Sequence, residues 1–232
     1  MDISRRALAT ALPLAGLAAV GGWMLFAPGK KPAEPQPDQN KPADTPQNAA
    51  ADVAKPVSLP DMALGPANAA VTITEYASMT CPHCAAFNAE VFPKIKSAYI
   101  DTGKIRYVFR EFPLDVRAAA GSMLARTIAK DDAAKYFTMI DVLFKQQPDW
   151  AYSKDSTAGL TRIGKQAGLS QQQVDSCLSD QALLDKIAAD QKYAAEILKV
   201  NSTPTFFING DMIKGEASFD IFDAKIKSLL KS

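Results

Sequence analysis

The sequence predicts an α/β protein in which the strands of one β-sheet are interrupted by a long helical block. Runs rich in β-branched and aromatic residues, typical of strands, occur at 71–76, 104–109 and 205–214. Between the second and third runs, from about Asp115 to Leu198, almost every segment has apolar residues at helical spacing. No internal repeat is visible, so we expect one globular unit with the helices inserted between strands of the same sheet.

The first 27 residues have the composition of an export signal or a membrane anchor. Arg5 and Arg6 precede an apolar run that extends to Ala27. The run is about 20 residues long, which is enough to span a bilayer if it is not cleaved. The arginine pair fits both a general secretory signal and a twin-arginine signal. We therefore expect the rest of the chain to work in an oxidising compartment outside the cytoplasm.

Residues 28–58 differ in composition from the rest of the chain, because Pro, Ala, Lys, Asp, Gln and Asn dominate. Such a segment buries too little apolar area to offset the entropy lost on ordering. We expect an extended, disordered linker that leads into a folded domain at 59–232. Two arrangements stay open: a membrane-anchored domain, or a cleaved domain with an unstructured N-terminus.

The first half of the folded domain is predicted to be strand, helix, strand. Residues 71–76 have the composition of a buried strand, in which Glu75 is the one acidic residue. The next segment has apolar residues three and four apart, which predicts a helix that Pro93 kinks or breaks. Residues 104–109 alternate between polar and apolar, which predicts the second strand.

The second half is predicted to be a helical block followed by a hairpin and a final helix. Ser170 is expected to cap one of the later helices of the block, which covers about 115–198. Asn209-Gly210 is a strong signal for a tight hairpin turn between two short strands. Residues 218–230 have the spacing of an amphipathic helix.

Charge and cysteine content exclude several classes of function. The chain has 26 basic and 25 acidic residues, so its formal charge of +1 gives no broad attraction to nucleic acid. Three cysteines are too few for a disulfide-stapled scaffold. Cys177 is predicted on the apolar side of a helix, where a free cysteine acts as a small buried hydrophobe, and a redox role is the alternative.

The segment Cys81-Pro82-His83-Cys84 indicates a redox centre, because two thiols separated by two residues can close and reopen a small disulfide ring. Pro82 suits the first position of a helix, which places Cys81 at its N-cap. The backbone N–H groups of His83 and Cys84 can then point at the Cys81 sulfur. We expect Cys81 to be the attacking thiolate, assisted by a protonated His83, and Cys84 to be the more buried resolving thiol.

Stabilising that thiolate favours the reduced protein and makes its disulfide a stronger oxidant, by roughly 30 mV for each pKa unit. A zinc site would need a second ligand pair, but Cys177 is isolated and His83 is the sole histidine. Covalent c-type haem would need a histidine at the position of Ala85. We expect no metal and no cofactor beyond the disulfide between Cys81 and Cys84, and a purely structural disulfide is the remaining alternative.

Two further positions are candidates for the same site. Glu75 lies on the strand that leads to the motif, and a carboxyl buried there could relay protons to or from Cys84. A solvated glutamate at a strand end is the alternative. Thr203-Pro204 precedes a strand, and a proline at that position is compatible with a cis peptide bond.

Taken together, residues 75–84 and 203–210, separated by a helical block, resemble the DsbA family of thiol:disulfide oxidoreductases. The resemblance covers roughly 59–230 and implies a thioredoxin fold with an inserted all-helical domain. It also implies that Glu75 is a buried acidic residue. A cis Pro204 would pack against the disulfide, and Thr203 and Pro204 would hold extended substrate chains by backbone pairing.

The function implied by the resemblance is the introduction of disulfide bonds into reduced, unfolded exported proteins in the periplasm. A DsbB-like, quinone-linked membrane partner would reoxidise the protein, which would act as a monomer, tethered to the inner membrane if the N-terminal segment is not cleaved. Two positions depart from the family pattern: Thr203 replaces a valine of the best-known enterobacterial members, and Asn88 stands where some relatives carry a second acidic residue. A disulfide isomerase or reductase of the same fold, or a non-catalytic tethered binding or chaperone module, are the alternatives.

Overall fold

The computed structural model of the protein describes residues 48–55 and 57–231. The predictions for the signal or anchor at 1–27, and for the linker up to residue 47, lie outside these residues. Within the described part of the chain, no helix has both the length and the apolar character needed to cross a membrane.

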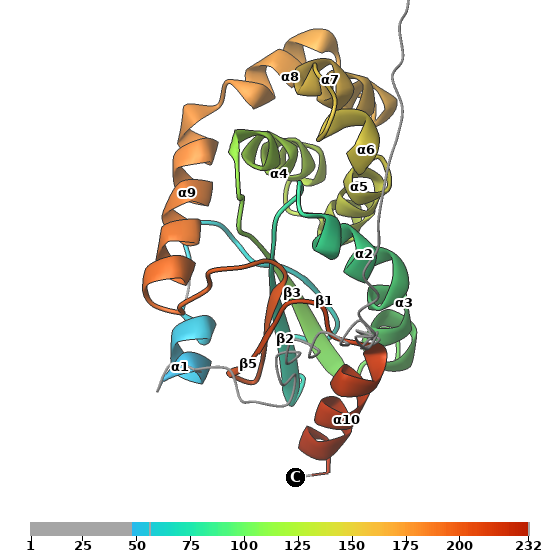
Figure 1. Ribbon diagram of the computed structural model, residues 1–232, viewed down its shortest axis with the longest axis vertical. Coiled ribbons are helices and arrows are strands. Elements are labelled where there is room, and N and C mark those ends of the chain that lie inside the picture. Colours follow the sequence, from blue (N-terminus) through green and yellow to red (C-terminus); the bar gives the residue numbers. More distant parts are fainter. Residues whose placement is uncertain (1–47, 56, 232) are drawn as a thin grey trace, which may run out of the picture. The chain divides into compact units, whose positions relative to one another are not determined.

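The centre of the fold is a five-stranded mixed sheet with the order β1-β3-β2-β4-β5 (Figure 1). Only β2 and β3 pair in parallel, and the other neighbouring strands are antiparallel. The strands are β1 (Met62–Leu64), β2 (Val71–Ala77), β3 (Ile105–Glu111), β4 (Thr205–Ile208) and β5 (Asp211–Lys214). The predicted strands are therefore confirmed, while β1 was not predicted because it has only three residues.

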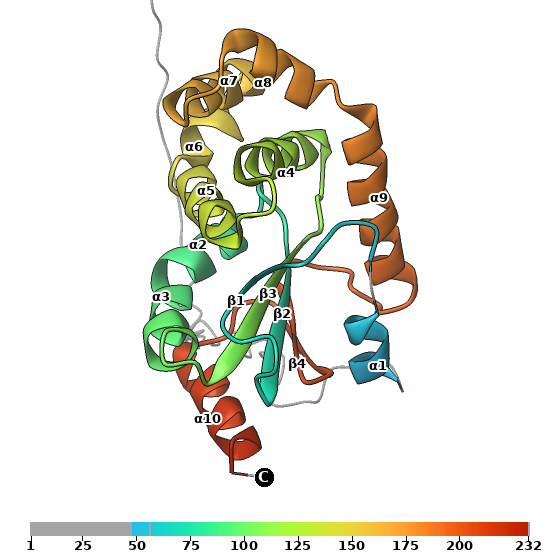
Figure 2. The ribbon, with the colours of Figure 1, turned by 180° about the vertical axis from the view of Figure 1, so that it is seen from behind.

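Helices cover both faces of this sheet, and six more form the insertion between β3 and β4 (Figures 1 and 2). One face carries α2 (Pro82–Glu90), α3 (Phe92–Ile95), the π-helical turn Lys96–Ile100 and α10 (Phe219–Leu229). The insertion consists of α4 (Val116–Ala129), α5 (Ala133–Lys145), α6 (Gln147–Trp150), α7 (Ser156–Gln166), α8 (Gln171–Leu178) and α9 (Gln181–Glu196). The prediction of an all-helical block at about 115–198 is confirmed.

Alternation along the strands divides the core between the two sheet faces. Ile73, Phe109 and Phe206 belong to the larger apolar cluster, which α2, α3, α10 and much of the insertion complete. Tyr76 and Phe207 point to the other face and belong to a smaller cluster with residues of the helix α1 (Ala49–Ala54) and of the end of α9. Because β2 has buried side chains on both faces, it is the central strand that the apolar sequence predicts.

The linker prediction is wrong at its C-terminal end, where residues 49–54 form the helix α1 (Ala49–Ala54). Ala49 and Val53 are buried in the smaller cluster, and the Tyr193 hydroxyl donates to the carbonyl of Asp52 at 3.0 Å. Gly210 permits this approach, since a Cβ there would lie 2.6 Å from the Ala50 Cβ. Composition predicted disorder because it does not register a docking site supplied by distant residues.

Four local features predicted from the sequence agree with the structure: a helix break, a helix cap, a tight turn and a buried cysteine. The helix after the motif breaks as Pro93 predicts, with α2 ending at Glu90 and α3 beginning at Phe92. Ser170 caps α8 in a capping box with Gln173, and Asn209-Gly210 forms the predicted tight turn with both φ angles positive. Cys177 is buried at 4% exposure, as the structural interpretation of this residue predicts.

Candidate active site

The two motif cysteines lie where β2 passes into α2. The chain leaves the sheet at Ala77, and Cys81 is the N-cap of α2, with Pro82 at the first helical position as predicted. Both cysteines are free thiols and both are buried, at 5% exposure for Cys81 and 0% for Cys84. A parallel strand followed by a helix thus brings a sulfur atom to the positive end of the helix dipole.

Cys81 has the electrostatics of a nucleophile, because its pKa is lowered from about 9 to about 5. The largest cause is a hydrogen bond from the Cys84 thiol, and burial opposes it. The Thr203 side chain and the backbone N–H groups of Cys84 and His83 lower the pKa further. The N–H groups at the start of α2 thus act on this sulfur as the sequence predicts.

Cys84 has the opposite character. Burial raises its pKa well above the usual value, and the hydrogen bond to Cys81 and the charge of Glu75 raise it further. Cys84 is therefore a neutral thiol over the whole physiological pH range. The pair combines one ready thiolate with one resolving thiol, which is the asymmetry that thiol exchange needs.

His83 is placed differently from the expectation that its ring would assist the sulfur directly. The side chain is 62% exposed, and its Nδ1 contacts a carboxylate oxygen of Glu216, in the segment after β5. The hydrogen bond and the charge of Glu216 raise the pKa of His83, to which the Cys81 anion adds a smaller effect. His83 acts on Cys81 mainly through its backbone N–H, while its ring pairs with a residue that no local sequence signal identified.

Glu75 is buried beneath the motif, as the relay hypothesis requires. It is 4% exposed, and the register of β2 places it between Phe109 of β3 and Phe206 of β4. The Tyr107 hydroxyl donates to its Oε2 at 2.6 Å. Burial raises the pKa of Glu75 to about 8, against the lowering effect of Tyr107.

Thr203 contacts Cys81, and the peptide bond between Thr203 and Pro204 is cis. The Cys81 thiol donates to the carbonyl of Thr203 at 3.3 Å. The Thr203 hydroxyl is buried without a hydrogen-bond partner among the described residues. Ionised Cys81 can accept from this hydroxyl, which explains how Thr203 lowers the pKa of that sulfur.

Two insertion residues that sequence reasoning missed also contact the motif segment. Gln147 donates through Nε2 to the carbonyls of Met79 and Cys81, and the Tyr152 hydroxyl lies 3.0 Å from the carbonyl of Thr80. No local pattern marks them, because they reach the site only through the folding of the insertion.

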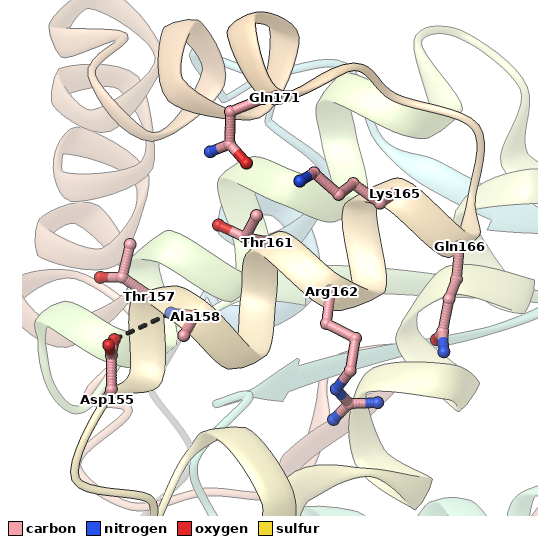
Figure 3. A pocket seen from close by; sticks show the side chains of 8 residues that line it. All are labelled: Asp155, Thr157, Ala158, Thr161, Arg162, Lys165, Gln166 and Gln171. Atoms are coloured by element: carbon pink, nitrogen blue, oxygen red, sulfur yellow. Dashed lines mark hydrogen bonds between the residues drawn. The ribbon is translucent and has the colours of Figure 1, made fainter.

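The insertion also carries an open hollow of about 830 Å³, lined by Asp155, by residues of α7 and by Gln171 at the start of α8 (Figure 3). Arg162 and Lys165 are among them, and none of the lining residues belongs to the cysteine motif. Among the residues that the structure describes, no three His, Cys, Asp or Glu side chains are grouped as a metal site requires.

Comparison with known proteins agrees with this geometry. The family model described as Thioredoxin matches residues 58–228. Among solved structures, α-DsbA1 of Wolbachia pipientis superposes with a TM-score of 0.72 at 34% identity, covering 78% of this chain and 96% of the other. The chain belongs to the DsbA family. The thioredoxin fold with an all-helical insertion, expected from the motif, is thus confirmed.

Two curated relatives place the DsbA-like chain among proteins of disulfide chemistry. A Rickettsia bellii protein, provisionally named a protein-disulfide oxidoreductase, is 37% identical over 150 residues, which are 65% of this chain and 57% of that protein. The disulfide bond formation protein D of Bacillus subtilis is 25% identical over 170 residues, 72% of this chain and 76% of the relative. The chain thus spans under two thirds of the Rickettsia protein's length.

Proposed function

We propose that the protein is a thiol:disulfide oxidoreductase that introduces disulfide bonds into reduced exported proteins in the periplasm, acting as a monomer. The observation that carries the proposal is the pairing of Cys81, with a pKa of about 5, and Cys84, whose pKa is raised well above its usual value. Residues 1–27 would serve as the export signal or membrane anchor, and residues 28 to about 47 as the linker.

The proposed cycle begins with the disulfide between Cys81 and Cys84. A client thiolate attacks the Cys81 sulfur, the bond to Cys84 breaks, and Cys84 leaves with the electron pair and takes up a proton. A second client thiolate then attacks the client sulfur of the mixed disulfide, and Cys81 leaves as a stable thiolate. The client has lost two electrons and the protein has gained them, and a DsbB-like, quinone-linked membrane partner would remove them.

Glu75 is proposed to supply the proton that Cys84 needs when it leaves. With a pKa of about 8 this carboxyl is protonated at neutral pH, and its ionised form raises the pKa of the Cys84 thiol. In the reverse step the same carboxylate would accept the proton from Cys84. We expect Glu75→Gln to slow the attack of Cys84 on a mixed disulfide at Cys81 at least tenfold at pH 7, because this step needs the Cys84 proton to be removed. An unchanged rate in stopped-flow measurements would exclude the relay.

Thr203 and Pro204 are proposed to hold the client. They lie against Cys81, because the carbonyl of Thr203 accepts a hydrogen bond from the Cys81 thiol. An extended client segment pairing with this backbone would bring its cysteine to the Cys81 sulfur.

The charge distribution favours an oxidant over a reductase. A Cys81 pKa of about 5, two units below pH 7, stabilises the reduced protein by about 2.7 kcal/mol, or roughly 60 mV. Stabilising the dithiol form raises the reduction potential, so the disulfide is a stronger oxidant of client thiols. This difference supports disulfide donation over the alternative of reduction with the same fold.

Equilibration with glutathione buffers tests the proposal. We expect a reduction potential well above the value of about −270 mV that is typical of thioredoxin. A potential near that value would assign the protein to the reductases instead. Cys81→Ser should abolish oxidation of a reduced client, and a variant that still promoted client folding would favour a binding or chaperone module.

A further inference from the structure

Three consecutive carbonyl groups in front of α2 are held by side chains of the helical insertion. Gln147 Nε2 donates to the carbonyl oxygens of Met79 at 2.9 Å and of Cys81 at 3.1 Å. The Tyr152 hydroxyl lies 3.0 Å from the carbonyl of Thr80 between them. All three peptide groups belong to the loop that carries the reactive sulfur, while both side chains come from more than 60 residues later in the chain.

The donor and acceptor arrangement fixes the orientation of the Gln147 amide. Both hydrogens of Nε2 are directed to carbonyls, and Oε1 lies 3.0 Å from the Tyr152 hydroxyl. That hydroxyl has one hydrogen, which Gln147 Oε1 and the carbonyl of Thr80 share. Gln147 is only 3% exposed, so water does not compete for these bonds.

The helix that presents Gln147 is firmly seated. Gln147 begins α6, and Trp150 at its end is fully buried and donates to the carbonyl of Leu143 at 2.8 Å. Two glycines make room for the indole, since a Cβ at Gly121 would lie 2.9 Å from its Cη2 and a Cβ at Gly159 2.6 Å from its Cβ. Trp150 therefore packs the end of α6 closely against α4 and α7.

We propose that Gln147 is a positioning residue for the reactive thiolate and acts through the peptide groups at 79–81. The hydrogen bond from the Cys84 thiol lowers the Cys81 pKa most, and the Thr203 side chain and the N–H groups of Cys84 and His83 lower it further, so the position of the sulfur relative to these groups sets its acidity. The Cys81 carbonyl also accepts the first hydrogen bond of α2, from the Ala85 N–H at 3.2 Å. Holding that carbonyl fixes the peptide plane from which the Cys81 side chain projects.

If Gln147 had a purely structural role, its substitution would be expected to change stability but not the Cys81 pKa. An amide that only satisfied two buried carbonyls would affect the free energy of unfolding without changing the acidity of the sulfur. The pKa of Cys81 is therefore the deciding measurement. The inference deepens the proposed function, but the deciding titration of the Cys81 thiol uses the reduced protein alone, without any client or oxidase.

The experiment compares Gln147→Met with Gln166→Met in the full chain. Methionine has the length of glutamine and no amide, and Gln166 is an exposed residue at the end of α7 (Figure 3). The ultraviolet absorbance of the thiolate, followed against pH, should show the Cys81 pKa raised by about one unit in Gln147→Met. The equilibrium constant for oxidation of glutathione by the protein disulfide should fall about tenfold in the same variant. Both values should be unchanged in Gln166→Met.

Tyr152→Phe provides a second variant in case Gln147→Met does not fold. The Tyr152 side chain is 55% exposed, so the loss of its hydroxyl leaves the core intact. We expect a smaller rise of the Cys81 pKa in the same direction. An unchanged pKa in folded Gln147→Met, or in Tyr152→Phe if the former does not fold, would overturn the inference. A thioredoxin-like potential of the wild type would instead refute only the oxidase function.

Discussion

Two glutamates on neighbouring strands are equally buried, but only one of them is paired with a cationic side chain in the part of the chain that the structure describes. Glu75 on β2 and Glu111 on β3 are 4% and 5% exposed, and each accepts a hydrogen bond from a tyrosine hydroxyl. Tyr107 serves Glu75 at 2.6 Å, and Tyr136 serves Glu111 at 2.5 Å. Only Glu111 has a counterion among the described residues, the guanidinium of Arg126.

The guanidinium of Arg126 compensates the burial of Glu111, and Glu75 has no such partner among the described residues. Arg126 binds both oxygens of Glu111, through Nε at 2.5 Å and Nη2 at 2.8 Å, which offsets the loss of hydration. Burial of Glu75 is not offset in this way, so its pKa rises to about 8. Equal burial of the same residue type therefore has different consequences, an ion pair with Arg126 at Glu111 and a raised pKa at Glu75.

The largest effect is expected from removing the charge of Glu111. Glu111→Gln leaves the guanidinium of Arg126 buried without its anion, which should lower the free energy of unfolding by about 3–5 kcal/mol. Urea denaturation at neutral pH measures this loss. The double variant Glu111→Gln/Arg126→Met should recover a large part of it, and a loss under about 1 kcal/mol in the single variant would show that the pair is not coupled as described.

The same substitution at Glu75 should act in the opposite direction. The folded pKa of about 8 lies above the usual value of 4.5, so the wild type loses stability as pH rises between these values, because only the unfolded chain ionises. Glu75→Gln removes that loss and should stabilise the reduced protein by about 2–3 kcal/mol at pH 7. Unfolding at pH 4 and pH 7 measures it, and a gain of the same size at both pH values would contradict the raised pKa.

The sequence predicted one of these glutamates better than the other. Glu75 is identifiable because it interrupts an apolar strand six residues before Cys81. Glu111 lies beyond the predicted end of its strand at residue 109, and Arg126 reaches it from the insertion. The four longer strands, the cap at Ser170 and the hairpin follow local composition, so they were predictable. Gln147, Glu111 and the docking of α1 depend on contacts between distant segments, which composition and periodicity do not encode.

Removing the hydroxyl groups of the two tyrosines that donate to Glu111 and Glu75 should have smaller effects than removing the carboxylates. Tyr136→Phe should lower the free energy of unfolding by about 1–2 kcal/mol, because Glu111 keeps Arg126. Tyr107→Phe removes the hydrogen bond that lowers the pKa of Glu75, so this pKa should rise above about 8. Carbon-detected NMR titration of the Glu75 carboxyl provides the measurement. A downward shift in Tyr107→Phe would mean that Tyr107 stabilises the neutral acid instead.

The smallest effect is expected at a third glutamate, which has a cation partner but no burial. Glu216 and His83 are 61% and 62% exposed, so water and salt weaken their attraction. Glu216→Gln should lower the pKa of His83 toward its ordinary value, since Glu216 is the main cause of its rise. NMR titration of the sole histidine measures this shift directly.

The Cys81 pKa should move by less than about half a unit in Glu216→Gln. A rise of the Cys81 pKa as large as that expected for Gln147→Met would mean that the exposed pair of His83 and Glu216 sets the acidity of Cys81. The buried contacts of Gln147 would then not be the cause.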